Sequence, residues 1–198
     1  MKISTLAVFD FDGTLFRSPQ EPAWWPEGEK GNFYLHQDSL GRPCVPDHPD
    51  DSWWIGSVVI EARKALTDPF ARAVLCTGRV DNLSFRWRVP ELLKQKGLDF
   101  DGVFLNRKSS VKEHKASTVK QILVKIPSIK VVKMWDDDQK NLDAVEAVVT
   151  TSGMQFESHL IRSTPKPLAC GPETYLEENP WSKDPAKRVA LRWIKRNA

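Results

Sequence analysis

Cysteine and histidine are scarce in this sequence, and neither is arranged as a ligand set. The three cysteines, Cys44, Cys76 and Cys170, are widely spaced, and no C-x-x-C pair or histidine at ligand spacing accompanies them. This pattern excludes a disulfide framework and a structural zinc site, and it favours a reducing compartment.

A long apolar run and a strong net charge are also missing. The first apolar run is interrupted by Asp10 and Asp12 before it reaches the length of a signal-peptide core, and no later run is long enough to span a membrane. We therefore expect a cytoplasmic or nuclear protein. A net charge of +3 over 198 residues identifies no class of partner.

Short apolar segments alternate with helical patterns along the chain. The expected strands are Leu6–Phe9, Ala73–Cys76, Val103–Leu105, Val131–Trp135 and His159–Ile161. The expected helices are 53–66 after a cap at Asp51 or Ser52, 89–96 ending before Gly97, and 116–126 ending before Pro127. The alternation predicts an α/β fold with a doubly wound, Rossmann-like parallel sheet.

Residues 17–52 break the alternation and predict an aromatic-rich insertion after the first strand. A structureless segment of this length is unusual in a compact domain unless it folds as a lid or cap. Trp24 and Trp25 either stack on bases or pack within the insertion, and both readings stay open. For Trp53 and Trp54, which precede an apolar helical face, packing is favoured.

The C-terminal residues 166–198 predict an extension that ends in a basic helix. Its last stretch, WSKDPAKRVALRWIKRNA, carries six lysines and arginines against the single Asp184. Such a face is usually only solvated, although it also suits a phosphate backbone.

Polar clusters follow three of the expected strands. Asp10 and Asp12 end the first strand, Thr77 ends the second, and the acidic stretch WDDDQKN ends the strand Val131–Trp135. In a doubly wound sheet the carboxyl ends of parallel strands form the ligand site. Because buried carboxylates are costly without a cation, we expect these clusters to meet in a functional site.

These segments resemble the four motifs of the haloacid dehalogenase (HAD) superfamily. FDFDGTLF is similar to the first motif, LCTGR to the second, Lys115 in EHKASTVKQIL to the third, and MWDDDQKNL to the fourth. More narrowly, residues 1–165 resemble the HAD domain of Swiss Army Knife RNA repair proteins, which is related to the phosphatase halves of polynucleotide kinase-phosphatases. His114 and Asp138 depart from that domain, which usually has an aromatic residue and an arginine there.

The resemblance implies a phosphatase site built on the first and fourth motifs. Asp10 is the expected nucleophile, and Asp12 is the expected acid and base. Mg²⁺ is expected on Asp10, on the backbone carbonyl of Asp12 and on Asp137, with Asp136 supporting. The register of Asp136 to Asp138 stays open, and Asp138 is alternatively the N-cap of the next helix.

Further side chains are expected to hold the phosphate. Thr77 donates a hydrogen bond to a phosphoryl oxygen, and Lys115 neutralises charge, with Lys112 and Lys120 as competing lysines. Thr14 is a further substrate-binding residue. Arg79 either reaches the phosphate bidentately or caps the helix around Phe85.

The favoured function is that of a Mg²⁺-dependent phosphomonoesterase that removes a terminal phosphate from an RNA or DNA end. A kinase or ligase partner in a repair system is compatible with this function. One alternative is a phosphatase for a small metabolite or nucleotide, and another is a non-catalytic nucleic-acid-binding module. The preferred end, the sugar and the oligomeric state do not follow from the residues.

Overall fold

The computed structural model describes residues 2–167, apart from 24, 26–30, 43 and 108. The chain divides into two compact units. The first comprises Met1–Arg17 and Asp50–Thr164, and the second contains Ser18–Pro49 with the chain from Pro165 on. Among the described residues, no helix combines the length and hydropathy that crossing a bilayer requires.

The first unit alternates strands and helices. Its strands are β1 (Thr5–Phe9), β2 (Ala71–Val80), β3 (Val103–Asn106), β4 (Val131–Asp136) and β5 (Gln155–Leu160). Its helices are α1 (Gly56–Thr67), α2 (Leu83–Gln95), α3 (Val111–Lys125) and α4 (Gln139–Thr151), and the 3₁₀ turn η4 (Asp51–Trp53) precedes α1.

The five strands form one parallel sheet in the order β3-β2-β1-β4-β5. Phe9 is in register with Leu75 on one side and with Trp135 on the other. The last residues of β1 and β4 are therefore level at one edge of the sheet, and β2 continues past them. This arrangement confirms the predicted α/β fold with a doubly wound parallel sheet.

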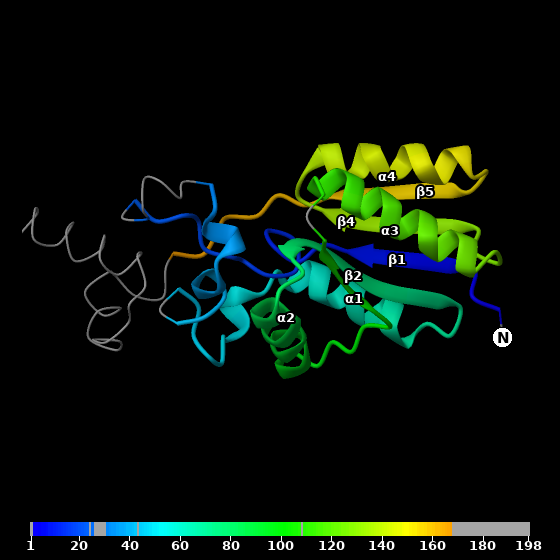
Figure 1. Cartoon of the computed structure of the whole chain (residues 1–198). Helices are drawn as coiled ribbons and strands as arrows, with labels where there is room; N and C mark the ends of the chain where they lie inside the picture. The colour runs from blue at the N-terminus through cyan, green and yellow to red at the C-terminus, as the bar shows by residue number, and fades with distance from the viewer. Residues whose placement is uncertain (1, 24, 26–30, 43, 108, 168–198) are drawn as a thin grey trace, which may run out of the picture. The chain divides into compact units, whose positions relative to one another are not determined.

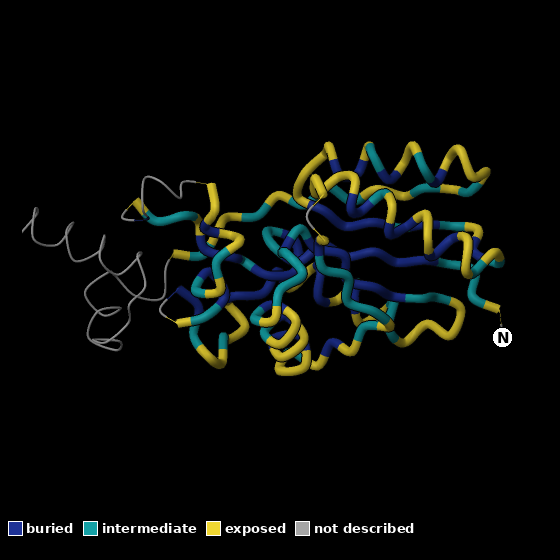
Figure 2. Tube along the Cα trace, viewed as in Figure 1, coloured by how far each residue is buried: buried dark blue, intermediate teal, exposed yellow. Residues whose placement is uncertain are grey.

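Helices cover both faces of the sheet, with α3 and α4 on one side and α1 and α2 on the other (Figure 1). The central strands β1, β2 and β4 are largely buried, whereas the edge strand β5 and the outward surfaces of the helices are more exposed (Figure 2). One core cluster fills the layer between the sheet and the pair α3 and α4, and it includes Leu6, Val8, Val119, Leu123 and Val145.

Alternation along β1 gives the two faces different roles. Leu6 and Val8 enter the aliphatic core under α3 and α4. Phe9 points to the opposite face, where its ring stacks on Trp135 at 4.4 Å. Asp10, the next residue, returns to the side of α3, which brings a carboxylate to the N-terminal part of that helix.

The entry to α1 differs from the prediction. The α-helix begins at Gly56 and not at Trp53, because Asp50 caps the separate turn η4 by accepting from Ser52 N at 2.8 Å. The expected cap residues Asp51 and Ser52 lie inside that turn. Trp53 and Trp54 are buried against Phe16, which confirms the packing interpretation for this pair.

The second unit contains two 3₁₀ turns, η2 (Phe33–Leu35) and η3 (Gln37–Ser39). Trp25 is buried there and contacts the rings of Phe33 and His36 edge-on, which favours packing over base stacking for this residue. Trp24 lies outside the described residues, as does nearly all of the expected C-terminal extension with its basic helix.

Neighbouring residues on α3 provide a test of how this helix sits on the sheet. Leu123 is buried in the core and Val124 is 76% exposed. We expect Leu123→Ala to lower the free energy of unfolding by about 2–5 kcal/mol, because it removes packed methyl groups and leaves a cavity. Val124→Ala should change it by less than about 0.5 kcal/mol. Urea unfolding of both variants measures the difference, and equal losses would contradict the orientation of α3.

Candidate active site

The carboxyl edge of the sheet gathers side chains from all four motifs. Asp10 follows β1, Thr77 lies in the extended end of β2, and Asp136 ends β4. Lys115 lies about one turn inside α3, which begins at Val111, five residues earlier than the predicted helix. All four residues are buried.

Lys115 is the central cation of the site. Its Nζ donates to Asp10 Oδ1 at 2.7 Å and to Asp136 Oδ2 at 2.6 Å. Burial alone would lower the pKa of Lys115, but the two carboxylates outweigh burial and raise the pKa above its ordinary value. Lys112 and Lys120, the competing lysines, are both exposed. The structure therefore brings Lys115, and neither competitor, to the carboxylates.

The Asp136 carboxylate accepts hydrogen bonds from three groups. Besides Lys115, it accepts from Asn141 Nδ2 at 2.9 Å and from the backbone N–H of Asp138 at 3.0 Å. These contacts hold the side chain in one orientation and suit a supporting acid. Asn141 is not among the residues that the sequence singles out, although its place one turn into α4 after an acidic cluster is a signal that could have found it.

Asp137 faces the site from the exposed side. A Cβ atom added at Gly13 would lie 2.2 Å from Asp137 Oδ2, and Gly13 has a φ of +70°. A side chain at residue 13 is thus excluded both by the left-handed backbone and by the carboxylate. Partial burial and the Asp136 charge raise the pKa of Asp137 to about 6.

Asp10, Asp136 and Asp137 form a group that could bind a metal ion. One carboxylate oxygen from each lies within 4.8 Å of the other two. Burial raises the pKa of Asp10 well above its ordinary value, although the nearby Lys115 opposes the shift. Oxygen ligands in this number suit a hard divalent cation such as Mg²⁺.

The charges of the site fit such a cation. When every group is ionised, four carboxylates stand against two cations and leave two negative charges uncompensated. The groups are Asp10, Asp12, Asp136, Asp137, Lys115 and Arg79. A divalent ion would balance this charge. Burial first, and the neighbouring carboxylates after it, raise the pKa values of Asp10 and Asp137.

Arg79 holds Asp12. Its guanidinium donates from Nε to Asp12 Oδ2 at 2.9 Å and from Nη2 to Asp12 Oδ1 at 2.6 Å, and it lies 5.1 Å from the centre of the Phe85 ring. Arg79 therefore lies against a ring of α2, whose N-cap is Asn82, and the expected contact of Arg79 with a phosphate stays a prediction. The ion pair between Arg79 and Asp12 was not predicted from the sequence, because it depends on the extension of β2 beyond its predicted end.

Two threonines complete the edge. Thr77 Oγ1 accepts from the backbone N–H of Arg79 at 3.2 Å, a contact that does not use the hydroxyl hydrogen. Thr14 is fully buried, and its Oγ1 has no hydrogen-bond partner among the described residues. A buried hydroxyl without a hydrogen-bond partner is costly. The Thr14 hydroxyl is therefore available to form a hydrogen bond with a group that enters the site.

Asp138 caps α4 by accepting from Lys140 N at 2.9 Å, which confirms its alternative role as a helix N-cap. His114 does not enter the carboxylate cluster. Its Nε2 contacts the carbonyl oxygen of Phe104 at 3.3 Å and Cys76 Sγ at 3.6 Å. The two positions that depart from the related RNA repair domains therefore have local structural partners.

A known family matches most of the chain. The family described as HAD domain family 1 in Swiss Army Knife RNA repair proteins matches residues 17–170. The chain belongs to this HAD domain family. The match begins after the segment that holds Asp10 and Asp12, so the placement of those two residues comes from the structure of this HAD domain itself.

Solved structures share the fold of this HAD domain. The HAD domain of the effector protein Lem4 from Legionella pneumophila is 15% identical, with a TM-score of 0.53 over 89% of this chain and 94% of that one. A chain of the Pnkp1/Rnl/Hen1 RNA repair complex is 13% identical, with a TM-score of 0.50 over 80% of this chain. This HAD domain covers only 43% of that repair-complex chain.

The raised pKa of Asp137 generates a stability prediction for the metal-free protein. A carboxyl whose pKa is higher in the folded state than in the unfolded chain binds its proton more tightly when folded. Stability is therefore lost as pH rises from the ordinary value of 3.8 to about 6, and the loss persists above that pH. We expect Asp137→Asn to raise Tm in EDTA at pH 7.5, and to raise it less at pH 4.

Asp138→Asn is the matched control. It removes a charge from the same acidic stretch, but asparagine caps a helix as well as aspartate does, so Tm should stay near that of the wild type. Added Mg²⁺ should stabilise the wild type more than Asp137→Asn. A destabilised Asp137→Asn protein at pH 7.5 would contradict the charge balance described above.

Proposed function

We propose that this protein is a Mg²⁺-dependent phosphomonoesterase that works through an aspartyl-phosphate intermediate. The observation that carries the proposal is the buried bridge from Lys115 to Asp10 and Asp136, with Asp137 beside it. A lysine and a divalent ion on one carboxylate prepare a site for a phosphate dianion, which two bare carboxylates would repel.

Asp10 is the nucleophile in this mechanism. One of its oxygens bonds Lys115, and the other attacks phosphorus. The new Asp10 O–P bond forms as the bond from phosphorus to the leaving alcohol oxygen breaks. Water then attacks the phosphorus of the acyl phosphate, which releases inorganic phosphate and restores the Asp10 carboxylate.

Asp12 moves the protons. It gives a proton to the leaving oxygen in the first step and takes one from the attacking water in the second. Arg79 orients the Asp12 carboxyl and, as phosphate enters, shares its donors with a phosphoryl oxygen. The hydroxyl groups of Thr77 and Thr14 donate to the other phosphoryl oxygens.

Asp10, Asp137 and the backbone carbonyl of Asp12 would hold Mg²⁺, while Asp136 orients Lys115 and the start of α4. When bound, the ion neutralises charge on the phosphoryl oxygens. Oxygen-rich ligands and the excess of two negative charges support this set of residues.

The proposed substrate is a polynucleotide with a terminal phosphate, in RNA or DNA end repair. Membership of a family from RNA repair proteins supports this class. The shared fold with a chain of the Pnkp1/Rnl/Hen1 complex is compatible with it. We further propose a cytoplasmic or nuclear setting in which a kinase or ligase acts on the same ends.

Substitution of the two first-motif aspartates tests the mechanism. We expect Asp10→Asn to abolish phosphate release from a 3′- or 5′-phosphorylated oligonucleotide, because the amide is a poor nucleophile and a weak metal ligand. Asp12→Asn should keep Mg²⁺ affinity and reduce turnover by about 10²–10⁴-fold, since it removes only the proton transfer. Phosphate release and calorimetric Mg²⁺ titration measure the two effects.

A comparison of oligonucleotide and mononucleotide substrates tests the proposed substrate class. Turnover on phosphorylated oligonucleotides should exceed turnover on free mononucleotides at the same concentration, and EDTA should stop both reactions. A folded Asp10→Asn protein with wild-type turnover would refute the mechanism. Preference for mononucleotides would favour the small-metabolite alternative and leave the chemistry intact.

A further inference from the structure

A second polar surface lies beside the active site, where the loops after β2 and β3 meet. The backbone N–H of Asp81 donates to Asn106 O at 2.8 Å and joins the two loops. Asp81 follows Arg79 by two residues, so this surface is continuous in sequence with the residue that holds Asp12.

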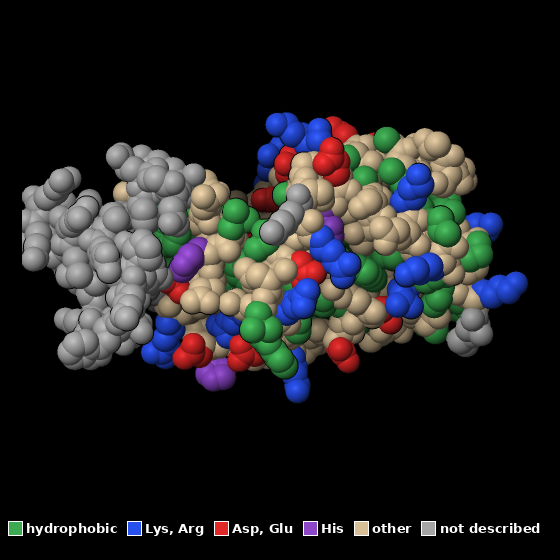
Figure 3. Space-filling view, viewed as in Figure 1, with side chains coloured by type: hydrophobic (Ala, Val, Ile, Leu, Met, Phe, Trp, Pro, Cys, Tyr) green, Lys and Arg blue, Asp and Glu red, His purple; other side chains and the backbone are tan. Residues whose placement is uncertain are grey.

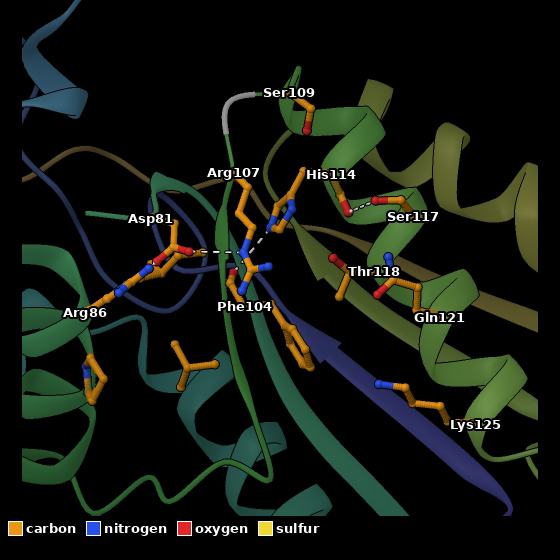
Figure 4. Close-up of a pocket in the computed structure, with 13 residues that line it drawn as sticks. Asp81, Arg86, Phe104, Arg107, Ser109, His114, Ser117, Thr118, Gln121 and Lys125 are labelled. Atoms are coloured by element: carbon orange, nitrogen blue, oxygen red, sulfur yellow. Dashed lines mark hydrogen bonds and ion pairs between the residues drawn. The ribbon is translucent and has the colours of Figure 1, made fainter. Parts of the chain in front are cut away.

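Two arginines share the single carboxylate of Asp81. Arg86 Nε, from α2, lies 2.5 Å from Oδ1, and Arg107 Nε, from the chain after β3, lies 3.1 Å from Oδ2. Figure 4 shows both guanidiniums converging on Asp81 from opposite sides. The trio carries one excess positive charge, and the Arg86 and Arg107 side chains are 58% and 86% exposed. A guanidinium has five N–H groups, and those that Arg86 and Arg107 expose suit a phosphate.

The trio forms one end of a groove of about 790 Å³ that runs between the edge strand β3 and helix α3. His114, Gln121 and Lys125 lie along its α3 wall (Figure 4). From His114 to Lys125 the helix rises roughly 16 Å, at 1.5 Å per residue. This length accommodates about four nucleotides of a stacked strand at 3.4 Å each.

An exposed aromatic ring, that of Trp87, directly follows Arg86 in the sequence of α2. Leu83 and Trp87, four residues apart on one face of α2, are 71% and 73% exposed. Figure 3 shows hydrophobic, basic and acidic side chains gathered together over α2. A tryptophan this exposed is unusual, and combined with nearby cations it provides both the stacking platform and the phosphate contacts that single-stranded nucleic acids use.

We propose that Trp87, Arg86, Arg107 and the adjoining groove bind the nucleotides of a single strand next to its terminal phosphate, an inference that rests on the phosphatase function proposed above. The charge of the groove favours a nucleic-acid strand over a peptide that would pair with β3 as a further strand of the sheet. The groove has basic residues at both ends, and the Phe104 carbonyl on the edge strand β3 is already engaged by His114. A protein partner is the competing outcome of the test below.

Fluorescence anisotropy with a labelled single-stranded oligonucleotide tests this surface without turnover, in the Asp10→Asn background. Trp87→Ala should weaken binding about 5- to 150-fold, the range for loss of one stacked base. Trp87→Phe should restore most of the affinity. Arg86→Gln with Arg107→Gln should lower the magnitude of the log Kd against log salt slope by about 1.4, twice the 0.7 per phosphate contact.

Matched controls separate this surface from general effects. Arg63→Gln with Lys133→Gln removes two positive charges, an exposed one from α1 and a half-exposed one from β4, and should leave the salt slope unchanged. Phe70→Ala removes another exposed ring and should leave affinity unchanged. Arg107→Gln alone, at a largely exposed residue, guards against loss of folding in the double variant, and Tm verifies each protein.

The outcomes distinguish this inference from the proposed function. Wild-type affinity in all the Trp87 and arginine variants would overturn the inference and leave the surface to a protein partner, even if oligonucleotides are dephosphorylated. Binding that depends on these residues, without any dephosphorylation by the active enzyme, would support the surface and refute the phosphatase proposal.

Discussion

The buried ion pairs of Lys115 are the interaction on which the rest of the site depends. Two carboxylates from different strands, Asp10 and Asp136, meet within hydrogen-bond distance of one ammonium group. Without that cation, burial and mutual repulsion would push the acids apart or protonate them. Because α3 supplies the lysine, the packing of this helix on the sheet sets the geometry of the chemistry.

Each acid has a different environment, which matches the different role that the proposed mechanism gives it. Asp136 is fixed by Lys115, Asn141 and the start of α4. Arg79 orients the Asp12 carboxylate, whereas Asp137 is exposed to solvent. When every group is ionised, the site carries two excess negative charges, which oppose folding and which a bound divalent cation would balance. The charges that lower stability are therefore the ones that could hold a metal at this edge of the sheet.

The strands β1, β3 and β4 could be predicted because apolar runs are a local pattern. The expected strand His159–Ile161 overlaps only the last two residues of β5, since Gln155, Glu157 and Ser158 interrupt any apolar run there. Apolar runs gave β1 and β4 almost to the residue, and parallel pairing then places Asp10 beside Asp136. Contacts that depend on the exact residue where a helix or strand ends were not predicted from the sequence. The pairing of Arg79 with Asp12 requires the extension of β2, and the exposure of Trp87 depends on which face of α2 packs.

The most direct test of the central claim is a search for the phosphoryl group on Asp10. Asp12→Asn protein, mixed with Mg²⁺ and an aryl phosphate such as p-nitrophenyl phosphate and then quenched in acid, should carry a hydroxylamine-sensitive phosphoryl group. Mass spectrometry of the peptide that contains Asp10 should locate it there, because an aryl oxide leaves without the proton from Asp12, whereas attack by water still needs Asp12 as the base. Phosphate release with an unlabelled Asp10, or a label on another residue, would contradict the account.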